Sequence, residues 1–68
     1  MRTFGKLRER IRNKYGTQKA FASAMDMDLS SLNLKLNGLR DWTLSDIEKA
    51  CKLLDIPKDE VKDYFFYD

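Results

Sequence analysis

Hydrogen-bonding side chains recur on one arc of a short segment in the middle of the chain. At about 100° per residue, Ser30, Asn33 and Asn37 lie on the same arc of a helix. Leu34 lies among them, and Leu32 falls on a different arc. Asn can pair with adenine through two hydrogen bonds, Ser can bond several bases, and Leu can contact the thymine methyl group. This spacing therefore suits the reading of DNA base edges, although Leu34 would suit contact with a protein equally well.

The residues needed for most catalysis or for a metal centre are missing. The sequence has one Cys and no His, so it cannot build a disulfide, an ordinary zinc site or a His-dependent catalytic device. Asp26, Asp28 and Ser30 have the odd-position spacing of a calcium loop. That loop needs Gly and Glu where Ser31 and Asn37 stand. We therefore expect no enzyme, no metal and no cofactor.

The basic residues are gathered at the start of the chain. Residues 1–19 carry a charge of +6 and residues 20–68 a charge of −4, which together give the net charge of +2. A strongly basic end indicates a polyanionic partner on that side. A solvated helix face would explain the same pattern, and charge alone does not decide between the two.

Apolar runs are short throughout the sequence. The longest covers residues 64–67, far below the ~20 residues that span a membrane. The first ten residues are charged and lack the apolar region of a signal peptide. We therefore expect a cytoplasmic protein with no membrane partner.

The apolar residues follow a helical period along the whole chain, and the 68 residues predict one all-α domain, 1–68. Five short helices are predicted, at about residues 3–15, 17–26, 29–36, 44–54 and 58–64. The second and third are joined by a short turn and form an embedded helix-turn-helix.

Local signals mark the helix boundaries. We expect Thr17 and Asp28 to cap the second and third helices, and Thr43 with Asp46 to form a capping box on the fourth. An apolar stripe on the fourth helix comprises Leu44, Ile47, Cys51 and Leu54. Cys51 is interpreted as a buried structural thiol, and Val61 and Phe65 are expected to face the core.

The segment from Thr17 to Gly38 resembles the helix-turn-helix of lambda-repressor/Cro-type phage regulators. The stretches 42–47 and 53–57 look like the fourth helix and following turn of that family, and 63–66 is similar to the ending of a short phage subgroup. The resemblance covers about residues 4–66. It implies a lambda-repressor-like DNA-binding domain, with Asp26 in place of the usual turn glycine.

The resemblance also implies residue roles. Ala22 stands where the two helices cross, and Leu32 is the buried residue of the recognition helix. The positions that read bases are Leu29, Ser30, Asn33 and Leu34. The positions expected at the DNA backbone, by resemblance or as flanking cations, are Thr17, Gln18, Lys19, Lys35, Asn37 and Arg40.

The function expected from these features is sequence-specific DNA binding. A Cro-like phage repressor would occupy a palindromic operator in double-stranded DNA as a homodimer, and the aromatic residues Phe66 and Tyr67 are expected at the dimer interface. The alternative belongs to another class of protein. An antirepressor would bind a repressor protein rather than DNA, with Leu29 and Leu34 as the apolar centre of its interface.

Overall fold

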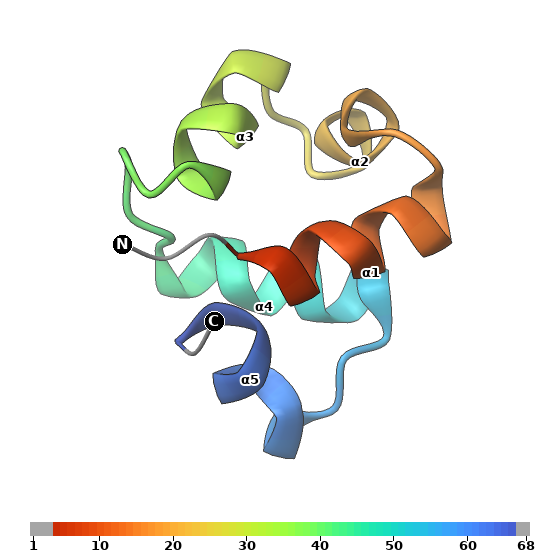
Figure 1. The fold of residues 1–68 in the computed structure, drawn as a ribbon, viewed down its shortest axis with the longest axis vertical. Coiled ribbons are helices and arrows are strands. Elements are labelled where there is room, and N and C mark those ends of the chain that lie inside the picture. Colours follow the sequence, from red (N-terminus) through yellow and green to blue (C-terminus); the bar gives the residue numbers. More distant parts are fainter. Residues whose placement is uncertain (1–3, 67–68) are drawn as a thin grey trace.

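The computed structural model describes residues 4–66, which form five α-helices and one short 3-10 helix (Figure 1). The elements are α1 (Gly5–Tyr15), α2 (Gln18–Ala24), α3 (Leu29–Leu36), α4 (Leu44–Leu54), η1 (Lys58–Glu60) and α5 (Val61–Phe65). The all-α, five-helix fold that the sequence predicts is confirmed. The last predicted helix is divided, since a 3-10 turn precedes α5.

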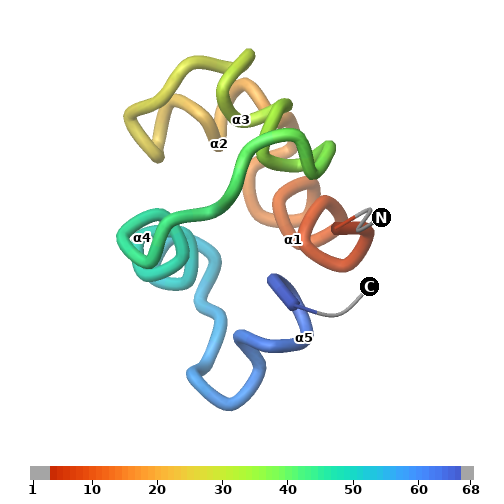
Figure 2. Tube along the Cα trace, turned by 90° about the vertical axis from the view of Figure 1, so that its left-hand side faces the viewer, coloured from red at the N-terminus to blue at the C-terminus, as the bar shows by residue number. Residues whose placement is uncertain are grey.

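Helix α1 is the centre of the packing. It contacts α2, α4 and α5, and its apolar residues Leu7 and Ile11 are fully buried. In Figure 2, α2 and α3 lie at one end of the molecule and α5 at the other, with α1 and α4 between them. The buried core consists of Phe4, Leu7, Ile11, Phe21, Ala22, Met25, Leu32, Leu36, Ala50, Leu54, Ile56, Tyr64 and Phe65. This arrangement holds the helix-turn-helix on a rigid base.

Two of the predicted helix caps are present. The Thr17 hydroxyl oxygen accepts a hydrogen bond from the Ala20 N–H, and Thr43 and Asp46 form the full capping box on α4. Asp28 occupies the N-cap position of α3, but its side chain accepts no capping hydrogen bond, so that prediction is wrong. The carboxylate of Asp28 is instead exposed beside the first turn of α3.

The apolar face of α4 differs from the predicted stripe. Leu44 is 73% exposed, whereas Ala50 and Leu54 are fully buried. Cys51 is only half-buried, and this burial raises the pKa of its thiol. The predicted stripe has the correct helical period, but the side of α4 that faces the core is centred on Ala50 and Leu54 rather than on Leu44. The small side chain of Ala50 allows α4 to approach the core closely.

Aromatic rings close the core at the C-terminal end. The Trp42 ring lies 5.2 Å from the Phe65 ring and 6.2 Å from the Phe4 ring, measured between centroids. Phe65 is buried as predicted, while Val61 is only partly buried. Phe66 is 48% exposed, and its place in a dimer interface stays a prediction; Tyr67 lies outside the described residues.

Candidate functional site

The turn between α2 and α3 has the geometry that a helix-turn-helix needs. Asp26 takes a left-handed conformation with φ of 60°, which Asp tolerates better than most residues. The Asp26 N–H donates to the Ser23 carbonyl and the Met27 N–H to the Ala22 carbonyl. The Asp that replaces glycine therefore preserves the turn.

The exposed side of α3 presents the four predicted base-reading residues. Leu29 is 39% exposed and Ser30 is exposed, while Asn33 and Leu34 are half-buried. Leu32 is fully buried, as expected for the residue that anchors this helix. All four residues are accessible to a partner, and what they bind remains a prediction.

A basic hollow lies where the end of α1, the start of α2 and the side of α3 meet. Its lining residues are Arg8, Ile11, Arg12, Gly16, Thr17, Gln18, Lys19, Leu29 and Asn33. The hollow joins three of the predicted backbone-binding residues to two of the predicted base-reading residues. Arg12 and Lys19 are exposed and form no ion pair within residues 4–66.

Lys35 does not belong to this surface, so its predicted role at a phosphate is wrong. The residue is only 7% exposed, and its Nζ donates to Asp46 Oδ2 at 2.6 Å and to the Asp41 carbonyl at 3.1 Å. Burial tends to raise the pKa of Asp46, but the hydrogen bonds from Lys35 and Thr43 outweigh it and hold that pKa below its ordinary value. Lys35 thus joins α3 to the start of α4.

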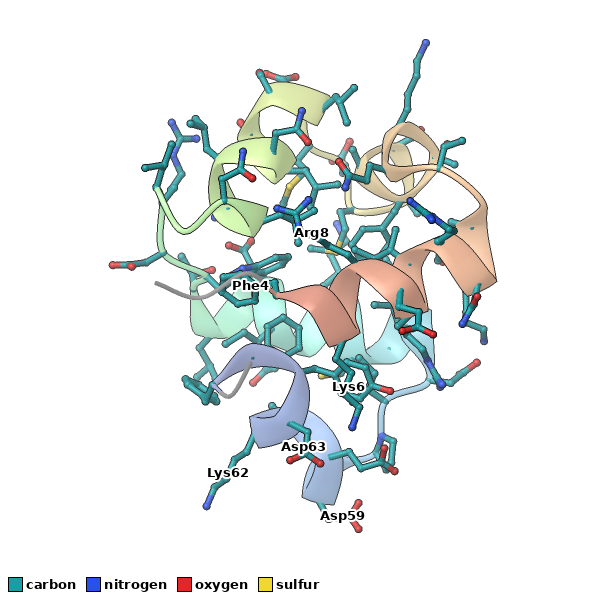
Figure 3. All side chains as sticks on the ribbon, viewed as in Figure 1. Phe4, Lys6, Arg8, Asp59, Lys62 and Asp63 are labelled. Carbon is teal, nitrogen blue, oxygen red and sulfur yellow. The ribbon has the colours of Figure 1, made fainter. Side chains whose placement is uncertain are left out.

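Arg8 has a structural contact that sequence reasoning missed. Its guanidinium extends from α1 toward α3 (Figure 3) and donates to the Leu36 carbonyl at 2.8 Å and to Asn37 Oδ1 at 2.7 Å. Asn37, predicted at the DNA backbone, is therefore held by a neighbouring helix. Nothing in the sequence distinguishes an arginine of the first helix that binds α3 from one that binds a phosphate.

Other basic residues of α1 are also occupied within the molecule. Arg10 donates to the carbonyls of Leu54 and Asp55, and Lys14 pairs with the Asp55 carboxylate. Lys6 lies 3.8 Å from Asp63 Oδ2, a pair visible in Figure 3. Much of the basic charge that suggested a polyanionic partner therefore binds α4 and α5.

Charges of both signs lie around α3, and the acidic ones stand at its start. The exposed Asp26 and Asp28 precede the helix, and with Lys19, Met27 and Leu29 they line a shallow hollow beside its first turn. Lys35 is the one cation within α3, and it is neutralised by Asp46. Arg40, predicted at the backbone, is exposed and donates to the Ser31 hydroxyl at 3.3 Å.

Residues 4–66 bring together no group of three or more Cys, Asp or Glu that could hold a metal ion. Within the same range no helix is both long and apolar enough to cross a membrane.

Comparison with known proteins identifies a family and a similar solved structure. Residues 2–68 match the protein family described as "Protein of unknown function (DUF739)". The solution structure of the modulator of repression (MOR) of the temperate bacteriophage TP901-1 from Lactococcus lactis is similar, with a TM-score of 0.85 and 34% identity. The similarity covers 94% of this chain and 86% of that one. No curated protein matches the chain.

Proposed function

We propose that this chain, which belongs to the DUF739 family of proteins of unknown function, is a phage regulatory protein that binds a repressor protein. The binding surface is the α2–α3 face, which comprises Asp26, Asp28, Leu29, Ser30, Asn33 and Leu34. Its similarity to a phage modulator of repression extends over nearly the whole chain. That similarity supports a role in the control of repression.

The observation that carries the choice of a protein partner is the pair of exposed carboxylates, Asp26 and Asp28, at the start of α3. A helix that enters the major groove passes between two rows of phosphates, and proteins place Lys and Arg there. Here Asp26 and Asp28 stand at the start of the helix, and Lys35 is buried in an ion pair. Two carboxylates in that position would repel the phosphates.

The composition of the α3 face also suits a protein interface. Leu29 and the half-buried Leu34 provide apolar contact, while Ser30 and Asn33 provide hydrogen-bonding groups. An apolar centre with polar surroundings is the usual anatomy of a protein–protein interface. The acidic residues 26 and 28 would then face basic side chains, such as those a repressor uses for DNA.

Operator binding is the second candidate, and the basic hollow favours it. Gln18 and Lys19 at the start of α2 lie in the same hollow as Asn33, so a phosphate bound there would place Asn33 near base edges. In this case Leu34 would contact a thymine methyl and the chain would act as a dimer.

Removal of the two carboxylates tests the proposal, because the two candidate functions predict opposite changes in binding affinity. Asp26→Asn with Asp28→Asn should weaken binding to the repressor of the same phage about tenfold. The same double variant should bind DNA more tightly if the α3 face reads an operator. Asn retains the left-handed tolerance that position 26 requires.

Both affinities are measured at physiological salt, with the repressor protein and with a random duplex library. Asp59→Asn is the matched control, since it removes an exposed carboxylate from the opposite end of the molecule. Enrichment of a palindromic duplex by the unmodified chain, with no binding to the repressor, would overturn the proposal in favour of operator binding.

A further inference from the structure

An apolar groove runs along α4 on the side that packs against neither α2 nor α3. It is lined by Leu44, Ile47, Glu48, Cys51, Lys52, Ile56, Lys58 and Val61, which together are called the α4 groove. Ile56 is buried at its base, and Ile47, Cys51 and Val61 are partly exposed along it. No element of the described chain covers this groove.

The α4 groove contains both a projection and a recess. Leu44 stands at the first turn of α4 and is 73% exposed. Cys51 lies seven residues further on, about 10 Å along the helix axis, next to Ile56 and Val61. A two-fold symmetric interface requires such self-complementarity, because the projection of each copy must meet the recess of the other.

The charges at the edge of the groove are of both signs. Glu48, Lys52 and Lys58 line it, and none of the three forms an ion pair within residues 4–66. A nucleic acid would be repelled by Glu48 and gain nothing from the apolar base. When a second copy packs with its α4 antiparallel to that of the first, Glu48 of each copy lies near Lys52 of the other.

We propose that the α4 groove is a self-association surface, in which two copies pack with their α4 helices antiparallel and Leu44 of each copy enters the groove of the other. The groove is lined by eight residues, fewer than the roughly 20–30 residues per partner of a standard interface, so the dimer forms at high protein concentration. Figure 2 shows α2 and α3 at the end of the molecule opposite α5, and none of the residues that line the α4 groove belongs to α2 or α3, so the α2–α3 face of each copy stays outside this interface. The dimer is therefore bivalent toward the partner of α3.

This surface differs from the C-terminal aromatic interface expected from the sequence. Phe66 lines a neighbouring hollow with Trp42 and Ile47, and Ile47 borders both hollows. Substitutions at Leu44 and at Phe66 therefore separate the two interfaces.

Analytical ultracentrifugation of the full chain under reducing conditions measures the association without repressor or DNA, so its outcome is independent of the proposed function. The mass should rise from 8.0 kDa toward twice that value as the concentration increases. Leu44→Glu should raise the dimer dissociation constant at least tenfold and leave the far-ultraviolet circular dichroism unchanged, because Leu44 is exposed. Phe66→Ser should leave the dimer in place.

Charge exchange tests the antiparallel arrangement directly. Glu48→Lys alone and Lys52→Glu alone should each prevent self-association, because like charges then face each other across the two-fold axis. An equimolar mixture of the two variants should associate, since both facing pairs become attractive. A wild-type chain that stays monomeric near millimolar concentration, a dimer lost with Phe66→Ser but kept with Leu44→Glu, or a mixture that fails to associate would each overturn the proposal.

Discussion

Lys35 shows how the burial of a single residue changes the charge that a helix presents to solvent. Its side chain reaches Asp46 and the Asp41 carbonyl from a largely buried position, so the aliphatic stem packs in the core while the ammonium closes an ion pair. The same Asp46 carboxylate accepts the Thr43 N–H at the start of α4. One contact therefore joins α3 to the cap of α4 and leaves α3 without a free cation.

Loss of the Lys35 ammonium should destabilise the fold. Lys35→Met keeps most of the buried stem but leaves the Asp46 carboxylate without its charge partner, which should lower the free energy of unfolding by about 2 kcal/mol. Urea unfolding at neutral pH measures the change. Lys19→Met is the control, because Lys19 is exposed and has no ion-pair partner among residues 4–66, and it should change stability by less than ~0.5 kcal/mol. Equal effects of the two variants would contradict the role given to Lys35.

The success of prediction at the residue scale depended on which physical rule governs each position. Leu32 and Asp26 were predicted correctly, because an apolar residue on the inner arc must be buried and a tight turn admits few residues. Lys35 was not, since a charged residue is expected outside unless a buried partner exists. Asp46, which supplies that partner, is eleven residues away, and no local pattern indicates the pair.

At the scale of elements, cations from other helices cover the C-terminal carbonyls of three helices. Arg8 donates to Leu36 at the end of α3, and Arg10 donates to Leu54 at the end of α4. Lys49 donates to the Met25 carbonyl at the end of α2. The last carbonyls of a helix have no partner within it and carry partial negative charge, so a cation there satisfies both needs.

Removal of the Arg8 cap should loosen α3 selectively. Arg8→Met loses the bonds to Leu36 and Asn37 and should lower the free energy of unfolding by about 1 to 2 kcal/mol. Amide hydrogen exchange should accelerate first in the last turn of α3. Arg12→Met is the matched control, because Arg12 lies one turn along the same helix, is exposed and forms no ion pair within residues 4–66. Unchanged protection of α3 in Arg8→Met would contradict the capping role.

The elements themselves were largely predictable from the sequence, whereas their mutual contacts were not. The predicted bounds of α3, about residues 29–36, agree with the structure, because a short apolar period follows Asp28 and ends before Asn37 and Gly38, residue types that commonly end a helix. The predicted orientation of α4 was wrong at Leu44, which is exposed although it was placed on the apolar stripe. The helical period alone does not show that Ala50 marks the closest approach of α4 to the core. Arg8 and Arg10 appeared as surface charge, because their acceptors are carbonyls distant in sequence.

For the whole molecule, α4 is held at both ends by carboxylates from its own terminal regions. Asp46 near its start pairs with Lys35 of α3, and Asp55 just past its end pairs with Lys14 of α1. The hydrogen bond and charge of Lys14 also hold the pKa of Asp55 below its ordinary value. Both ion pairs therefore connect α4 to the helices that carry the candidate interface.

These two lowered pKa values set the direction of the pH dependence of stability. A carboxylate whose pKa is lower in the folded state stabilises the fold above its unfolded pKa of about 3.9, and this stabilisation is lost as the pH falls through the folded pKa. The free energy of unfolding should therefore be constant near neutral pH and decrease below about pH 4.

Urea unfolding between neutral and strongly acidic pH should give a smaller decrease for Asp46→Asn than for the wild-type chain. Asp55→Asn should also flatten the curve, and added salt should reduce that effect because Asp55 is exposed. Parallel curves for the three proteins would mean that neither ion pair holds α4 in place.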